Sequence, residues 1–171
     1  MLESDSSCNW VVCGGDDTLP DPNNHPDKIA TECSAYFSGT LGVMQPTGDT
    51  WSDSMGRIIE RIAGSPWIGR SFALRANSGN GPWYPDYWHM FGDEHLQCVA
   101  SKLGIFWQRP DLVHYHDHWG RPRPGEHGAD INRMPDFLKE ANSSTEWVRA
   151  KDLFERQRAD GFIEALGLLP A

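Results

Sequence analysis

The stretch Trp10-Val11-Val12-Cys13-Gly14-Gly15-Asp16-Asp17 joins a short apolar run to two glycines and two carboxylates. An apolar run of this length that stops at glycine is typical of a buried strand entering a loop. The two carboxylates therefore follow the carboxyl end of a strand. Because ligands bind at that edge in open α/β sheets, the stretch indicates both the fold class and the edge where a site is expected.

Helix and strand patterns alternate after this stretch. The spacing of apolar residues predicts helices over 27–37, 55–63 and 94–103, with strands over 40–45, 71–75, 105–107 and 112–113. Asp93 is predicted to cap the third helix and Gly104 to end it. The segment 76–92 is predicted to be long, irregular and rich in aromatic residues, and such segments are often functional. A final surface helix begins at Ser143, which forms a capping box with Glu146.

The composition excludes several classes of protein. A length of 171 residues with 39% hydrophobic content suits one globular domain, 1–171. The net charge of -9 argues against nucleic acid as a partner, because binding phosphates broadly requires clustered Lys and Arg. Four cysteines without a C-x-x-C pair favour a reducing compartment, so we expect a cytoplasmic protein. No apolar run is long enough for a transmembrane segment.

Asp16 and Asp17 are candidate metal ligands. Carboxylates at a strand end suit Mg²⁺ or Mn²⁺, since these hard cations take oxygen ligands and keep positions open for substrate phosphates. Gly14 and Gly15 would let a diphosphate approach the backbone closely. The alternative for the pair in isolation is an Asp-rich turn.

Gly92-Asp93-Glu94 stands at the start of a predicted helix, where the helix dipole favours negative charge. One carboxylate is expected to cap the helix. The other can face a cleft as a general base that takes a proton from an attacking hydroxyl. Capping and catalysis are compatible at this position.

His114, His116 and His118 alternate along the chain. A period of two places all three side chains on one face if the strand continues, and imidazole is a ligand of transition metals. A single histidine is more often structural. Three alternating histidines favour at least one metal ligand among them.

These three motifs, in this order and spacing, resemble the family 2 glycosyltransferases with the GT-A fold. The segment 11–22 resembles that family's strand and its DxD-type metal motif. Phe91-Gly92-Asp93-Glu94 with the following helix resembles its acidic catalytic motif. The segment 110–116 resembles the next strand, after which a histidine can complete the metal site.

The resemblance implies a transfer of sugar from a nucleotide-sugar donor to a hydroxyl acceptor, with Mn²⁺ or Mg²⁺ as cofactor. It implies that Asp16 and Asp17 contact the metal and the diphosphate, and that Asp93 or Glu94 is the base. His116 or His118 would be the further metal ligand. The sugar or acceptor side would be shaped by residues of two segments: Trp67, Gly69, Arg70, Trp83, Trp88 and His89.

The implied fold is α/β, a GT-A-like mixed sheet with flanking helices. The resemblance covers 9–121, and 122–171 is expected to be a C-terminal loop and helix of the same domain. The family's nucleotide-recognising βαβ segments precede the acidic motif, where this chain has only a short segment. We therefore expect a chain that lacks this N-terminal half, as a fragment, a shortened reading frame or a subunit that borrows it. The Asp-Asp spacing leaves open which carboxylate binds the metal.

Two other functions account for part of the pattern. A Zn²⁺-dependent hydrolase would use His114, His116 and His118 to bind a metal that activates water. A non-catalytic carbohydrate-binding module would use the aromatic residues without turnover. Metal preference and nucleotide dependence separate these alternatives from the glycosyltransferase.

Overall fold

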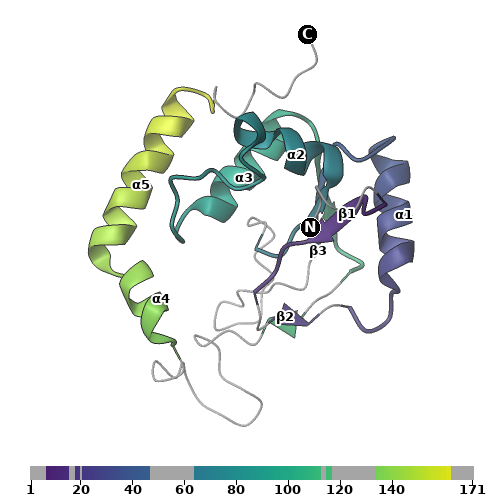
Figure 1. Cartoon of the computed structure of the whole chain (residues 1–171), viewed down its shortest axis with the longest axis horizontal. Helices are drawn as coiled ribbons and strands as arrows, with labels where there is room; N and C mark the ends of the chain where they lie inside the picture. The colour runs from purple at the N-terminus through teal and green to yellow at the C-terminus, as the bar shows by residue number, and fades with distance from the viewer. Residues whose placement is uncertain are drawn as a thin grey trace.

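The computed structural model describes residues 7–15, 18–19, 21–46, 64–112, 115–116 and 134–162. The described chain is a mixed α/β fold with an open four-stranded sheet between helices (Figure 1). The strands are β1 (Trp10–Val12), β2 (Thr18–Leu19), β3 (Val43–Pro46), β4 (Trp67–Gly69), β5 (Phe106–Arg109) and β6 (Tyr115–His116). The helices are α1 (Pro26–Tyr36), α2 (Arg70–Gly79), α3 (Gly92–Lys102), α4 (Asp136–Ala141) and α5 (Ser144–Ala159).

The sheet has the strand order β1-β4-β3-β5. β4 runs antiparallel to both β1 and β3, and β3 runs parallel to β5. β1, β3 and β5 therefore share one direction, and their carboxyl ends meet at one edge of the sheet. β2 and β6 form a separate antiparallel pair.

Alternation along the strands divides the core into two layers. In β3, Val43 packs on one face of the sheet and Met44 on the other. In the neighbouring β4, Ile68 joins Val43 and Trp67 joins Met44. A period of two places successive side chains on opposite faces, so each strand contributes to both layers.

α1 covers the first face. Ile29 and Cys33, four residues apart, are its buried residues, because that spacing keeps them on one side of a helix. Pro26 opens the helix at its first position, where the missing N–H would have no partner inside the helix. The core on this face consists of Trp10, Ile29, Cys33, Met44, Trp67 and Leu112.

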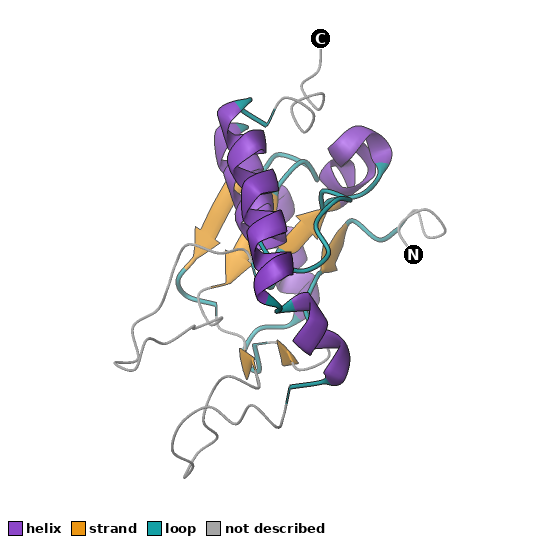
Figure 2. Ribbon diagram, turned by 90° about the vertical axis from the view of Figure 1, so that its left-hand side faces the viewer, coloured by secondary structure: helices purple, strands orange, loops and turns teal. Residues whose placement is uncertain are grey.

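Three helices cover the second face. Phe72 and Ala76 from α2, Leu96 and Val99 from α3, and Phe154 from α5 all join its core. Figure 2 shows the long helix α5 lying in front of the sheet, as an outer layer over this face. Among the described residues, no helix combines the length and the apolar character needed to cross a membrane.

The predicted strand at 10–13 and the predicted helices at 27–37 and 94–103 are confirmed by β1, α1 and α3. The predicted strand over 71–75 is wrong, because these residues lie in α2. Phe72, Ala73 and Ala76 are buried in α2, and their spacing fits one face of a helix. A short apolar run of this kind fits a strand equally well, so periodicity alone does not separate the two. Leu112 lies outside any strand, and the predicted helix over 55–63 lies outside the described residues.

The capping box predicted at the start of α5 is half formed. The Ser143 hydroxyl accepts a hydrogen bond from the Glu146 backbone N at 3.3 Å, as an N-cap does. The Glu146 carboxylate turns to Arg149 instead, accepting from its Nε at 2.7 Å and its Nη2 at 2.6 Å. An ion pair one turn along the helix therefore replaces the reciprocal bond to Ser143.

Candidate functional site

A pocket of about 350 Å³ lies at the edge where the parallel strands end. This volume falls in the range of small-molecule sites. Its wall includes the loop after β1, the turn before α1 and the apolar layer under α1, through Gly14, Gly15, Thr18, Asp21, Trp67 and Leu112. The pocket therefore lies where open α/β sheets bind their ligands.

The loop after β1 is folded tightly against the pocket. Thr18 N donates to Gly15 O at 3.2 Å, which joins the backbone on the two sides of Asp16 and Asp17. Gly14 lies so close to Thr18 that a Cβ at position 14 would meet the Thr18 Cβ at 3.2 Å. A side chain at Gly14 would crowd the loop at the point where it enters the pocket wall.

The β2–β6 pair connects two of the sequence motifs through the backbone. Thr18 pairs with His116, and Leu19 pairs with Tyr115. The chain that follows Asp17 is thus hydrogen-bonded to the chain that carries the histidines. Asp16, Asp17, His114 and His118 lie outside the described residues, as does the His116 side chain.

The shared metal site therefore stays a prediction. Among the described ranges, no group of three or more His, Cys, Asp or Glu residues is placed to hold a metal ion. The donor types proposed from the sequence, two carboxylates and an imidazole, suit a divalent cation. The β2–β6 pairing supplies the backbone proximity that such a site requires.

Asp93 and Glu94 lie in the first turn of α3, and the prediction that Asp93 caps this helix is wrong. The N-cap is Phe91, which has a left-handed backbone at φ 65° and makes no side-chain capping bond. Its ring packs 5.5 Å from Phe154 and 5.8 Å from Trp147, contacts that hold this conformation in place. Capping accounts for neither carboxylate, and the helix dipole favours both.

α3 turns back directly into β5. Ile105 N donates to Ala100 O at 2.9 Å, and Gly104 has the positive φ of 69° that ends the helix. Because α3 packs on β5 and runs in the opposite direction, its first turn lies toward the edge where β5 ends. Asp93 and Glu94 are partly buried, lie on the opposite face of the sheet from the pocket, and do not line it.

His95, next to Glu94, is a core residue and a poor candidate for a base. Its ring lies between Tyr84, Tyr87 and Phe162 at centroid distances of 5.1, 5.4 and 5.1 Å. Burial lowers the pKa of His95 to about 4, so it is neutral at pH 7. Burial likewise raises the pKa of the Tyr87 hydroxyl. The neutral His95 ring is thus part of an uncharged aromatic cluster.

Two hydrogen bonds connect the aromatic segment 83–89, which precedes α3, to helix α5. Arg149 Nη2 donates to Asp86 O at 3.0 Å, and Gln157 Nε2 donates to the Tyr84 hydroxyl at 3.0 Å. Trp83 packs against the core, whereas Trp88 is 57% exposed. His89 is also on the surface. Of the three residues predicted here for the acceptor side, Trp88 and His89 have the exposure to contact a ligand.

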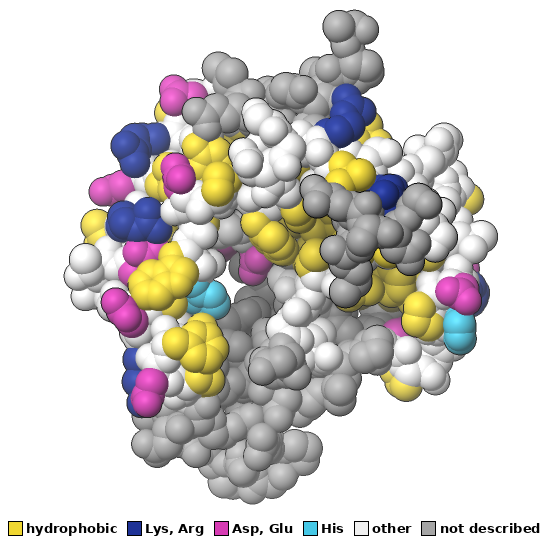
Figure 3. All heavy atoms as spheres, viewed as in Figure 1, with side chains coloured by type: hydrophobic (Ala, Val, Ile, Leu, Met, Phe, Trp, Pro, Cys, Tyr) yellow, Lys and Arg dark blue, Asp and Glu magenta, His cyan; other side chains and the backbone are white. Residues whose placement is uncertain are grey.

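The helices α4 and α5 present a mixed surface beside this segment. Figure 3 shows acidic and basic side chains along that side of the molecule, with hydrophobic side chains between them. Phe137 of α4 and Trp147 and Val148 of α5 are the large apolar residues exposed there. Trp147 lies under Lys151, whose ammonium is 5.0 Å from the ring centroid.

The substrate-site residues predicted in β4 and at the start of α2 lie toward two different edges of the sheet. Trp67 lines the pocket, whereas Gly69 and Arg70 lie at the opposite edge because β4 runs antiparallel to its neighbours. A Cβ at Gly69 would stand 2.2 Å from Thr40 O, and Arg70 Nη1 donates to Cys8 O at 3.0 Å. Both residues make structural contacts, and of the three only Trp67 lines the pocket.

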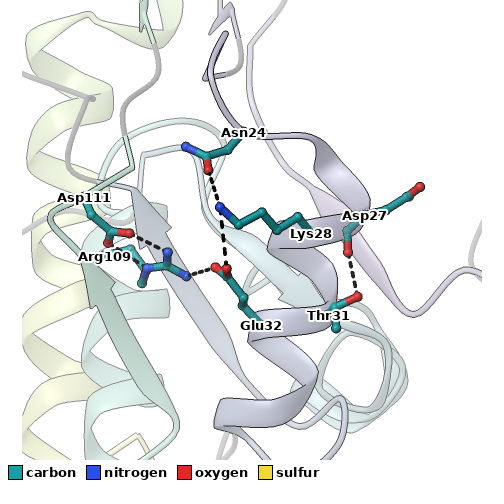
Figure 4. A network of polar contacts seen from close by, with 7 residues as sticks. All are labelled: Asn24, Asp27, Lys28, Thr31, Glu32, Arg109 and Asp111. Atoms are coloured by element: carbon teal, nitrogen blue, oxygen red, sulfur yellow. Dashed lines mark hydrogen bonds and ion pairs between the residues drawn. The ribbon is translucent and has the colours of Figure 1, made fainter.

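Sequence reasoning missed the ion-pair network at the end of β5 (Figure 4). Arg109 donates to Asp111 through Nε at 2.7 Å and Nη2 at 2.5 Å, and to Glu32 of α1 through Nη1 at 2.8 Å. These hydrogen bonds lower the pKa of the Asp111 carboxyl. The network ties α1 to the turn that precedes the pocket residue Leu112. The only sequence signal for this network was an Arg and an Asp two residues apart at the end of a strand.

Comparisons with protein-family models, with characterised proteins and with solved structures find no match to this chain. The resemblance to family 2 glycosyltransferases therefore depends on the sequence motifs alone.

Proposed function

We propose that this chain is a metal-assisted glycosyltransferase domain that transfers a sugar from a nucleotide-sugar donor to a hydroxyl acceptor. One observation carries the proposal. The pocket lies at the carboxyl ends of the parallel strands, and its wall includes Gly14, Gly15 and Thr18, which flank the two carboxylates of the acidic motif. The pairing of Thr18 with His116, which joins the backbone of one histidine of the motif to a residue of the pocket wall, supports the proposal further.

The glycine-rich loop suits a diphosphate. Gly14 and Gly15 carry no side chain that would keep a phosphate from the backbone. Asp16 and Asp17, with His116 or His118, would hold Mn²⁺ or Mg²⁺ beside it. When bound there, such a cation would supply positive charge beside the leaving diphosphate.

The carboxylates of α3 supply the proton chemistry. Glu94 or Asp93 takes the proton from the acceptor hydroxyl as its oxygen forms a bond to the anomeric carbon. The bond from that carbon to the diphosphate oxygen breaks, and the nucleoside diphosphate leaves with the electron pair. The position of both residues in the first turn of α3, where the helix dipole favours an ionised carboxylate, supports this assignment.

Calorimetric titration with UDP-glucose and GDP-mannose, with and without Mn²⁺, tests the proposal. We expect weak binding that requires Mn²⁺ or Mg²⁺ and little or no transfer by this chain alone, because hard cations retain water unless substrate phosphates supply ligands. Hydrolysis that requires Zn²⁺ and no nucleotide would instead identify the hydrolase. Sugar binding that ignores metal and nucleotide would identify the non-catalytic module.

Replacement of the two carboxylates tests the chemical step. Asp93→Asn and Glu94→Gln keep the size of each side chain, and each removes one charge from the first turn of α3, so we expect only a small fall in melting temperature. The variant that removes the base should lower the rate of transfer by about 10²- to 10⁴-fold. Near-normal transfer by both variants would contradict the assignment of the base to α3.

A further inference from the structure

Phe91 joins the aromatic segment 83–89 to helix α3, and its backbone is unusual for so large a residue. Its φ of 65° lies in the left-handed region, where a bulky side chain is an outlier. An N-cap residue ordinarily has an extended backbone. A left-handed backbone costs a non-glycine residue free energy and persists only where the surrounding structure imposes it. The contacts of Phe91 therefore indicate which part of the molecule determines how α3 begins.

Helix α5 supplies aromatic contacts to Phe91. The ring of Phe154 stacks on the Phe91 ring, with centroids 5.5 Å apart and planes 29° apart. The ring of Trp147 lies 5.8 Å away at an angle of 57°. Trp147 and Phe154 are two helical turns apart, so they lie on the same side of α5. Phe91 thus contacts two turns of one helix.

The same helix holds the chain before Phe91. Arg149 Nη2 donates to Asp86 O at 3.0 Å, and Gln157 Nε2 donates to the Tyr84 hydroxyl at 3.0 Å. α5 therefore contacts this stretch of chain at three points, and the third is the last residue before α3.

The backbone of Phe91 determines how the first turn of α3 is oriented. Phe91 O accepts from His95 N at 2.9 Å, and Asp93 and Glu94 lie between these two residues. The angle φ at Phe91 sets the direction of this turn relative to the segment that α5 holds. The body of α3 is packed in the core. A more common φ at Phe91 would therefore force the first turn out of the helix and break the bond to His95 N.

We propose that α5 positions the first turn of α3, with Phe91 as the positioning residue and Trp147 and Phe154 as the rings that hold it. The contacts with these rings offset the strain at Phe91. Without them, Phe91 leaves the left-handed region and the carboxylates of Asp93 and Glu94 lose their fixed place. The role of either carboxylate as a base rests on the proposed function, whereas their positioning by α5 does not.

NMR on the whole chain tests the proposal. A left-handed residue brings its own amide hydrogen close to its Hα, so Phe91 should show a strong NOE between the two. Trp147 is 42% exposed, so Trp147→Ala is expected to fold. This variant should weaken the NOE and speed hydrogen exchange of the His95 amide by about two- to tenfold, the range for loss of one aromatic pair. Trp147→Phe keeps a ring and should restore both signals.

Two controls separate this effect from a general loss of stability. Val148→Ala changes the next residue of α5, which is 52% exposed, and should leave both signals unchanged. The Leu103 amide, bonded to Val99 O at 3.0 Å, reports on the other end of α3. It should exchange at its natural rate in Trp147→Ala. Equal acceleration of the His95 and Leu103 amides would contradict the proposal.

The Phe91→Gly background gives the sharpest test. Glycine adopts a positive φ without strain, so the first turn of α3 no longer needs the rings of α5. Adding Trp147→Ala should then leave exchange of the His95 amide unchanged, and the same acceleration in both backgrounds would overturn the proposal. Phe91→Asn, which also tolerates the left-handed region, replaces the glycine variant if that variant does not fold.

Two further results would also overturn the proposal: a natural chain without the strong Phe91 NOE, or a Trp147→Ala variant that matches the natural chain in both signals. None of these measurements involves nucleotide, metal or turnover. Failure of the positioning role is therefore distinguishable from failure of the proposed sugar transfer.

Discussion

In the part of the chain that the structure describes, one helix covers the face of the sheet that carries the pocket, whereas helices α2, α3 and α5 all pack on the other face. The α1 face is held at its border by the Arg109 network and leaves about 350 Å³ open beside its core. The opposite face is larger and includes the aromatic cluster around His95. Among the described residues, the α1 face therefore carries the candidate ligand site, while the opposite face supplies most of the apolar burial.

Truncation of one buried leucine on each face should give the largest difference in the free energy of unfolding. Leu96 on the α3 face and Leu112 on the α1 face are each 1% exposed, but only Leu112 borders the pocket. Leu96→Ala should lower the free energy of unfolding by about 3 to 5 kcal/mol, because the close packing around it leaves a cavity. Leu112→Ala should cost about 2 to 3 kcal/mol, since its surroundings already include open space. Urea unfolding of both variants checks the order, and equal losses would contradict it.

The pH dependence of stability is expected to come from His95, on the face of the sheet that α2, α3 and α5 cover. Because the pKa of His95 falls from 6.5 to about 4 on folding, the unfolded chain binds a proton that the folded chain does not between these values. Above pH 6.5 the residue is neutral in both states and full stability is present. The free energy of unfolding falls as the pH drops from 6.5 toward 4. The expected loss is roughly 1 kcal/mol per pH unit within that window.

Urea unfolding of His95→Phe at pH 7.5, 6 and 5 isolates this effect. The variant should lose this part of the slope, whereas His25→Gln, on the exposed start of α1, should keep it. A slope that is the same in His95→Phe and the natural chain would place the titrating group elsewhere.

The ion pairs at the border of the α1 face are expected to contribute less. Arg109 has 11% side-chain exposure, but its partners Asp111 and Glu32 are 60% and 36% exposed and reach water when it is removed. Arg109→Met should therefore cost about 1 to 3 kcal/mol, less than breaking a fully buried pair. The matched variant Arg158→Met removes an exposed pair with Glu155 and should cost at most about 1 kcal/mol. Similar losses in thermal melts of the two variants would show that the network does not fasten α1.

The comparison also explains what the sequence could predict. β1 was predictable because Trp10, Val11 and Val12 form a short apolar run that stops at glycine. α1 was predictable because Ile29 and Cys33 repeat at helical spacing. Both signals are local, and each depends on a pattern within one element.

The residues that were missed depend on contacts between distant parts of the chain. Ile29 and Leu112 share the pocket wall although they are far apart in sequence, and Arg109 finds Glu32 across two elements. The helix over 70–79 was missed because a short run such as Phe72-Ala73-Leu74 fits either period until its packing against the sheet selects one. The carboxyl-edge position of Gly14 and Gly15, which precede the acidic motif, was predictable, but the walls of the pocket around them were not.

The location of the metal is the central claim that one experiment tests most directly. Substoichiometric Mn²⁺ added to ¹⁵N-labelled protein broadens amide signals near the bound ion. The amides of Gly14, Gly15 and Thr18 should broaden first, while those of Gly69 and Arg70 at the opposite edge stay sharp. Broadening confined to exposed carboxylates such as Asp136, or spread equally over both edges, would contradict a metal-assisted site at the carboxyl ends of the strands.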